Sequence, residues 1–237
     1  PPFFQYINYA LSQIYGPVFS FFGVISHSGE LWASETGRTI VMSIGRLVST
    51  FFGMMQIYWV YLIGKRFFSP RVGLLAAFII AVNPLLIFDN HILKVDSLLA
   101  FLFTAQLYLI LLYWEERNSK TLFMLGMVTG LAIAAKFQAA VEIPLLVFLV
   151  TMVKWRSGMW NCLKSLFALA GWVLLGFFIG APNWLVHMIG NIKAAFSYVN
   201  ELYFSFELYD KSVIAFPLYF KDFAASFGPV VMLGVLG

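Results

Sequence analysis

Long apolar runs, separated by short polar stretches, dominate the chain. Six runs are candidates to cross a bilayer as helices: residues 39–64, 71–88, 97–114, 121–135, 137–153 and 163–181. A further run begins near residue 224 and stops at 237. The runs lack the period-two alternation of barrel strands, whereas a helix satisfies its backbone hydrogen bonds within one segment. The pattern predicts an all-α, polytopic membrane protein with about six to seven transmembrane helices.

Composition supports this class. Hydrophobic residues make up 61% of the chain and charged residues 11%, whereas a soluble domain carries roughly 25% charged residues. The single cysteine excludes an internal disulfide framework. A net charge of +4 does not indicate nucleic acid, because in a membrane protein the position of basic residues matters more than their sum. Membrane lipids are the expected surroundings.

We expect one transmembrane domain over residues 1–237. It comprises an outer-face loop with an amphipathic helix (1–37), six transmembrane helices (38–181), a second outer-face loop (182–223) and the start of another helix (224–237). Polar residues recur on one side of the first segment, which favours a helix at the membrane interface over the tail of a preceding span. The abrupt start, without the basic region of a signal peptide, and the short last run indicate a fragment.

The apolar stretch 121–153 is too long for one span, and both of its flanks are polar and basic. If both flanks lie on one side of the membrane, the stretch crosses twice and turns near Lys136 to Glu142. Each arm of about 15 residues is then roughly 23 Å long, less than the hydrocarbon thickness of about 30 Å. The turn is therefore expected in a recess below the far surface, with Lys136 lining it.

The distribution of basic residues predicts an orientation. Three short loops carry eight of them, and we assign these loops to the cytoplasm: Lys65, Arg66, Arg71, Arg117, Lys120, Lys154, Arg156 and Lys164. The other loops are rich in acids and aromatic residues. This orientation places residues 89–96, the Lys136 recess and residues 182–223 together on the non-cytoplasmic side.

The stretch between two apolar runs at residues 89–96 is unusually polar. It holds Asp89, Asn90, His91, Lys94 and Asp96, and ionisable residues at such a position are a functional-site hypothesis. A solvated loop is the alternative. Asp96 opens a span, so it either caps the helix or serves as a catalytic or metal-binding carboxylate. His91 either adds a nitrogen ligand for a divalent metal or is simply solvated.

Two cations inside apolar segments are candidates to bind an anionic substrate. Lys136 either snorkels to the interface or pairs with Glu142, or it lines the recess, where its compact charge suits a phosphate. Arg46 lies inside the first span, where an unpaired guanidinium is costly, so we expect it to have a partner.

Several short segments, in order and spacing, resemble the membrane core of polyprenyl-phosphate-sugar glycosyltransferases of the GT-C fold. Family 39 protein mannosyltransferases and bacterial aminoarabinose lipid A transferases are the nearest resemblances. The similar segments are residues 45–50 and 60–77, Asn83-Pro84 followed by Lys94-Val95-Asp96, Gly130-Leu131-Ala132 with Lys136-Phe137, Ala181-Pro182-Asn183 with Tyr219, and the opening Pro1-Pro2 with Gly16.

The resemblance implies transfer of a sugar from a polyprenyl-phosphate carrier to an acceptor at the outer membrane face. It implies Asp96 as a catalytic residue, Lys94, Lys136 and Arg46 as substrate-binding residues, and Asp96 with His91 as ligands if a divalent metal takes part. Lys94 stands where arginine is common. The acid of the first outer loop would lie before Pro1, outside this chain. The inner membrane of a prokaryote is favoured over the endoplasmic reticulum.

Two other functions fit the same residues. A transporter or flippase for an anionic lipid would use the basic recess without a general base, and internal inverted repeats would favour it; the sequence shows none. A non-catalytic assembly subunit would leave residues 89–96 as an ordinary loop.

Overall fold

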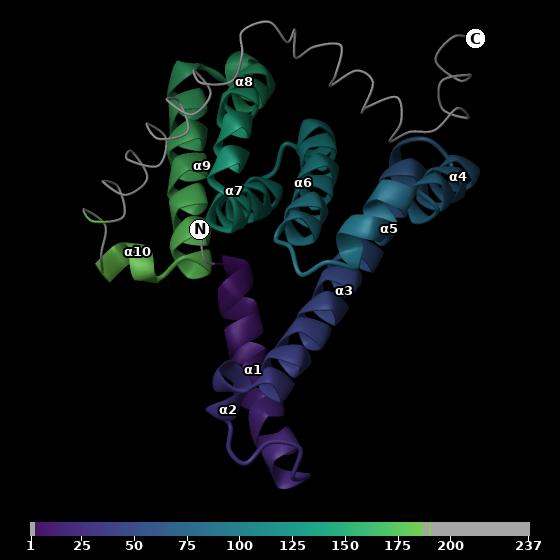
Figure 1. The fold of residues 1–237 in the computed structure, drawn as a ribbon. Helices are drawn as coiled ribbons and strands as arrows, with labels where there is room; N and C mark the ends of the chain where they lie inside the picture. Colours follow the sequence, from purple (N-terminus) through teal and green to yellow (C-terminus); the bar gives the residue numbers. More distant parts are fainter. Residues whose placement is uncertain (1–2, 187–189, 191–237) are drawn as a thin grey trace, which may run out of the picture. The chain divides into compact units, whose positions relative to one another are not determined.

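The computed structural model describes residues 3–186 and residue 190, and this part of the chain is helical (Figure 1). The longer helices are α1 (Phe3–Phe21), α3 (Glu35–Phe67), α4 (Pro70–Ala81), α6 (Asp96–Glu116), α7 (Ser119–Ala135), α8 (Ile143–Lys154) and α9 (Met159–Gly180). Short helical segments lie between or after them: α2 (Glu30–Ala33), α5 (Pro84–Asn90), η1 (Phe137–Glu142), η2 (Trp155–Ser157) and α10 (Asn183–Val186). The predicted all-α class is confirmed.

The chain divides into two compact units. One comprises residues 1–82 and 86–182, and the other comprises residues 83–85 and 183–237. In the second unit, the backbone N–H of Leu85 donates to Asn83 Oδ1 at 3.0 Å, and α10 follows Pro182. The fold and the site below concern the first unit. The predicted outer-face loop 182–223 and the last run 224–237 lie almost entirely outside the described residues.

Helix α3 is long enough to cross a bilayer and begins at a defined cap. The Ser34 hydroxyl accepts from the backbone N–H of Gly37 at 3.0 Å, which satisfies one of the free donors of the first turn. Along α3 the buried positions recur every four residues and are mostly small: Gly37, Val41, Gly45, Ser49 and Gly53. Small residues let neighbouring segments approach closely. At Gly53, an added Cβ would overlap the Asn90 side chain.

The predicted span 71–88 is wrong as a single helix. Helix α4 stops at Ala81, α5 begins at Pro84, and the two are bent by 63°. Proline lacks the backbone N–H that a continuing helix needs, and it disfavours helical geometry in the residue before it. The Asn83-Pro84 pair therefore breaks the helix, and the pair α4 and α5 is either one broken span or a re-entrant loop.

The predicted turn within 121–153 is confirmed. Helix α7 ends at Ala135, η1 makes the turn, and α8 continues to Lys154. The Lys154 ammonium donates to the backbone carbonyl of Arg117 at 3.0 Å, so the end of α8 returns to the start of α7. At about 1.5 Å per residue, α7 is roughly 25 Å long. The depth of the turn in the membrane stays a prediction.

Glycines hold α7 against α9. Gly126 and Gly130 on α7 face Trp172, Val173 and the backbone near Gly176, and Gly180 faces Ala134. Gly126 with Gly130, and Gly176 with Gly180, are each four residues apart. Such small-xxx-small pairs allow the helix backbones to touch. Helix α9 also packs on α8 (Figure 1), and α6, α7, α8 and α9 share one apolar core.

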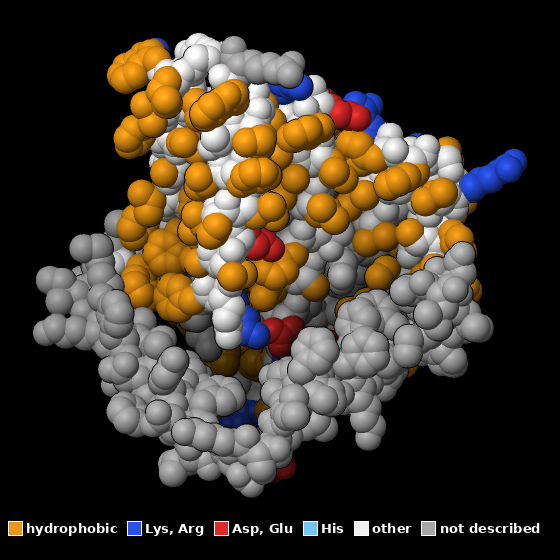
Figure 2. Space-filling model, turned by 90° about the horizontal axis from the view of Figure 1, so that it is seen from above, with side chains coloured by type: hydrophobic (Ala, Val, Ile, Leu, Met, Phe, Trp, Pro, Cys, Tyr) orange, Lys and Arg blue, Asp and Glu red, His pale blue; other side chains and the backbone are white. Residues whose placement is uncertain are grey.

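The span count is lower than predicted. In the described residues four segments are long and apolar enough to cross a membrane, and a fifth is present if α4 and α5 count as one broken span. Helix α7, with 17 residues, falls short by itself. Hydrophobic side chains cover much of the face seen in Figure 2, and large ones such as Leu47, Phe78 and Phe167 are exposed. A lipid-facing surface has this composition.

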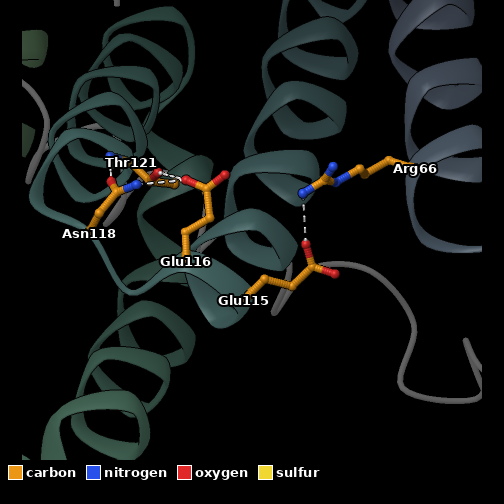
Figure 3. A network of polar contacts seen from close by, with 5 residues as sticks. All are labelled: Arg66, Glu115, Glu116, Asn118 and Thr121. Atoms are coloured by element: carbon orange, nitrogen blue, oxygen red, sulfur yellow. Dashed lines mark hydrogen bonds and ion pairs between the residues drawn. The ribbon is translucent and has the colours of Figure 1, made fainter.

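The three basic loops lie at one end of the first unit. Arg66, at the end of α3, pairs with Glu115, at the end of α6, at 3.3 Å (Figure 3). Lys154 joins the α8 end to Arg117, as described above. The prediction that these loops share one side therefore agrees with the fold; their assignment to the cytoplasm stays a prediction.

Helix α1 buries one residue in every four along one side. Its buried residues are Phe4, Asn8, Ser12 and Gly16, and the helix contacts α3 and α7. Its exposed residues include Tyr9, Ile14 and Phe21. The predicted helix is present and amphipathic, and its interfacial location stays a prediction.

Candidate functional site

An ion pair joins two residues that are forty positions apart in sequence. Lys136 Nζ lies 2.8 Å from Asp96 Oδ1. The lysine side chain is 36% exposed and the aspartate side chain 43% exposed. The pair is therefore accessible to a ligand. The helices that carry it are nevertheless packed together, because Leu98, Ala132 and Ala135 are buried in one apolar cluster.

The end of α7 fixes Lys136. Its backbone is extended, with φ −155° and ψ 124°, so the helix stops there. The Lys136 N–H still donates to Ala132 at 2.9 Å, and its carbonyl accepts from Ala139 at 3.0 Å. Because both backbone groups are used, the position from which the side chain leaves is set by α7 and η1 together.

The start of α6 positions Asp96. Its carboxylate lies in the first turn, where the helix dipole favours negative charge. The cap residue is Val95, and no side chain caps this helix. The described contact of the Asp96 carboxylate is with Lys136, so the simple capping interpretation does not account for its position.

The other residues of the polar stretch pair locally. Lys94 Nζ lies 3.6 Å from Asp89 Oδ1, and both side chains are partly exposed. The Asn90 carbonyl accepts from Thr50 on α3 at 3.2 Å. His91 Nδ1 lies 2.7 Å from the Ile87 carbonyl, which occupies one of its two ring nitrogens. The structure thus brings Asp96 to Lys136, and Lys94 to Asp89.

The described residues do not assemble a metal site by themselves. Within 3–186 and 190, no group of three or more His, Cys, Asp or Glu side chains could hold a metal ion. Asp96 is engaged by Lys136, and His91 by the backbone of α5. The predicted metal role of Asp96 and His91 therefore stays a prediction, and no chemical step below depends on it.

Arg46 lies on an exposed side of α3, next to the buried Gly45. We expected it to have a partner. Among the described residues, its guanidinium makes no ion pair or side-chain hydrogen bond, although its carbonyl accepts from Thr50 at 2.9 Å. The Arg46 side chain is exposed, so the expected partner is not found in this part of the chain.

An open groove of about 900 Å³ lies beside the start of α6. Leu93 and Val95, which flank Lys94, line it together with residues of α1, α2 and α3: Phe4, Gln5, Tyr6, Asn8, Tyr9, Trp32 and Val41. Its lining is mainly aromatic and apolar. An amphiphilic ligand could rest in this groove with its polar end near Asp96.

A buried polar contact between α6 and α7 was missed by the sequence analysis. Gln106 Nε2 donates to Thr129 Oγ1 at 3.0 Å, and the Thr129 hydroxyl donates to Leu125 at 2.7 Å. Both residues are 1% exposed. Gln106 is a polar amide inside an otherwise apolar run, which is the signal that could have found it. Lys136 pairs with Asp96, so the alternative partner Glu142 is not used.

Comparison with known proteins now decides the family. The dolichyl-phosphate-mannose-protein mannosyltransferase family matches residues 38–185, more than half of the chain. The chain belongs to this family. The match covers the helices from α3 to α9 and includes Arg46, Asp96 and Lys136. No curated protein and no solved structure gives a significant match.

Membership of the mannosyltransferase family confirms the resemblance and the general function. Its members are membrane glycosyltransferases that use polyprenyl-phosphate sugar donors. The apolar helices agree with an integral membrane protein. The family favours the transferase over the flippase and over the non-catalytic subunit. It does not assign the sugar, the acceptor or the membrane face.

Proposed function

We propose that this chain forms the membrane core of an enzyme that moves a sugar from a polyprenyl-phosphate carrier to an acceptor hydroxyl at the non-cytoplasmic face. The acceptor is a lipid, a glycan or a protein. The Asp96–Lys136 pair is the centre of the site. The single observation that supports this assignment most strongly is the 2.8 Å contact between the two charges, which unites a proton acceptor with a phosphate-binding cation.

The position of the pair supports the outer-face assignment. Asp96 begins α6, and Glu115 lies near its other end, which joins the basic loops through Arg66. A helix of 21 residues is roughly 32 Å long, about the thickness of the hydrocarbon. If the basic loops are cytoplasmic, the Asp96–Lys136 pair lies near the opposite surface.

In the proposed reaction the acceptor hydroxyl oxygen attacks C1 of the sugar. The bond between C1 and the phosphate oxygen breaks, and its electron pair stays on the departing polyprenyl phosphate. The acceptor proton passes to a carboxylate, for which Asp96 is the candidate in this chain. Lys136 turns from Asp96 to the phosphate and stabilises the charge that develops there.

The remaining cations have supporting roles in this proposal. Lys94 and Arg46 are partly or largely exposed near the same end of the bundle, where they can attract the donor phosphate. The groove lined by Phe4, Trp32 and Val95 runs beside them and suits the apolar part of a lipid-linked molecule. These contacts would hold the donor while the sugar is transferred.

Transfer and donor binding by the complete protein test the proposal. The purified protein is supplied with a panel of radiolabelled polyprenyl-phosphate sugars and with membranes as the source of acceptor, and labelled product is counted. Lys136→Met removes a charge-assisted contact, commonly worth about 1.5–3 kcal/mol, so donor affinity is expected to fall about 10- to 100-fold.

Lys120→Met is the matched control, because Lys120 is exposed on the same helix at its opposite end. It should leave donor affinity within about twofold of the unchanged protein. Equal affinity of the Lys136 variant and the control would overturn the phosphate-binding role. Transport of the intact donor without transfer of its sugar would overturn the transferase itself.

A further inference from the structure

A second hollow lies at the opposite end of the bundle from Asp96 and Lys136. It has a volume of about 460 Å³ and is lined by Trp114, Arg117, Met152, Val153 and Trp155. It forms where α6 ends and where α8 passes into η2. Two indoles, two apolar side chains and one guanidinium therefore surround a single open pocket.

The backbone holds Arg117 firmly at this pocket. Arg117 ends α6 in the left-handed conformation, with φ 52° and ψ 25°. Its N–H donates to Tyr113 at 3.0 Å, and its carbonyl accepts from the Lys154 ammonium at 3.0 Å. The carbonyl contact also brings a second cation to the edge of the pocket.

The nearby acids are already engaged. Glu115 pairs with Arg66 at 3.3 Å, and Glu116 accepts from Asn118 at 2.6 Å and from Thr121 at 3.3 Å (Figure 3). In the described part of the chain, the Arg117 guanidinium has no carboxylate partner. The pocket therefore offers an exposed positive charge that is free to contact an anion.

We propose that this pocket binds the headgroup of an anionic phospholipid. The phosphate contacts the Arg117 guanidinium, which suits phosphate because its donors are planar and paired. The acyl chains lie on Met152 and Val153, and the indoles of Trp114 and Trp155 stand at the headgroup level, where tryptophan is enriched.

The chemistry of the lining favours an amphiphilic ligand over a purely ionic one. Most of the lining is apolar, so a free anion would leave the apolar part of the pocket unfilled. A lipid would fill that part with its acyl chains and would place its phosphate at Arg117. In sequence, the three basic loops carry eight basic residues and two acids, Glu115 and Glu116, and basic pockets between transmembrane helices bind anionic headgroups. The inference does not depend on the sugar-transfer proposal.

Native mass spectrometry of the complete detergent-solubilised protein tests whether the pocket binds an anionic phospholipid. Phosphatidylglycerol is titrated in, with phosphatidylcholine and inorganic phosphate as separate arms. Arg117→Gln is expected to weaken phosphatidylglycerol binding at least about tenfold, the scale of one charge-assisted hydrogen bond. Lys120→Gln removes the same charge nearby but does not line the pocket, and it should change binding less than about twofold.

Arg117→Gly removes the guanidinium without endangering the fold, because glycine favours the left-handed conformation at a helix end. It should lose phosphatidylglycerol as the glutamine variant does while unfolding no earlier than the unchanged protein. Equal losses in the Arg117 and Lys120 variants would show diffuse attraction and overturn the site. Equally tight phosphatidylcholine binding, or displacement of the lipid by equimolar inorganic phosphate, would overturn it too.

Discussion

Replacing Gly130 by alanine tests how closely α7 must approach α9 to hold Lys136 in place. A Cβ at Gly130 would lie 2.5 Å from the backbone nitrogen of Phe177 and 2.8 Å from the carbonyl carbon of Gly176. Both atoms belong to the α9 backbone, so no side-chain rotation relieves the overlap. The two helices must separate or shift.

The expected change in the free energy of unfolding follows from two opposing effects. Overpacking a tight contact costs about 1–3 kcal/mol, whereas alanine improves the helix propensity by about 1 kcal/mol. Gly171→Ala on α9 supplies the control, because a Cβ there meets nothing within 4 Å and only the propensity gain remains. The free energies of unfolding of the two variants should therefore differ by about 1–3 kcal/mol.

Thermal unfolding in one detergent measures this difference. At about 2–4 °C per kcal/mol for a chain of this size, the Gly130 variant should unfold several degrees below the Gly171 variant. It should also lose donor affinity, since Lys136 directly follows α7. Unfolding midpoints of the two variants within about a degree would refute the close packing of α7 on α9.

Three further outcomes are expected. Thr129→Val keeps the side-chain shape but leaves the buried Gln106 amide without its acceptor, and it should lower the free energy of unfolding by about 1–2 kcal/mol in a denaturation assay; an unchanged value would show that the contact is not made. Arg66→Gln breaks the exposed pair with Glu115 and should cost less than about 1 kcal/mol, and a larger loss would mean that the pair is buried by another part of the protein. Lys120→Cys, in a chain whose own cysteine is replaced by serine, should resist an impermeant thiol reagent added to intact cells and react after permeabilisation, whereas labelling from outside would reverse the orientation.

The sequence predicted those helices whose ends are set by the length of an apolar run and by the charged residues beside it. The runs 97–114 and 163–181 fall almost wholly within α6 and α9, and the polar flanks of 121–153 located the turn at Lys136. These features are local, because an apolar run ends where charged residues begin. The proline at position 84 was an equally local signal, and the interpretation of 71–88 as one span gave it too little weight.

Partner choice could not be predicted in the same way. Lys136 had two acids within plausible reach, Glu142 at six residues and Asp96 at forty, and the packing of α6 on α7 chose the distant one. Arg46 was expected to have a partner, yet among the described residues its exposed guanidinium makes no ion pair. The Gln106–Thr129 contact likewise depends on the rotation of α6 and α7 about their axes. Residues close together in sequence do not determine that rotation.

The rate of sugar transfer by Asp96→Asn in the complete protein tests the central claim most directly. The variant keeps the shape and removes the charge, and Asp89→Asn is the matched control, because Asp89 also pairs with a lysine in the same polar stretch. At matched expression, Asp96→Asn is expected to lower transfer by about 10²-fold or more, the scale of losing general acid–base catalysis, while Asp89→Asn keeps near-normal transfer. Near-normal transfer by Asp96→Asn would show that the Asp96–Lys136 pair only holds α6 and α7 together, and it would contradict the proposed site.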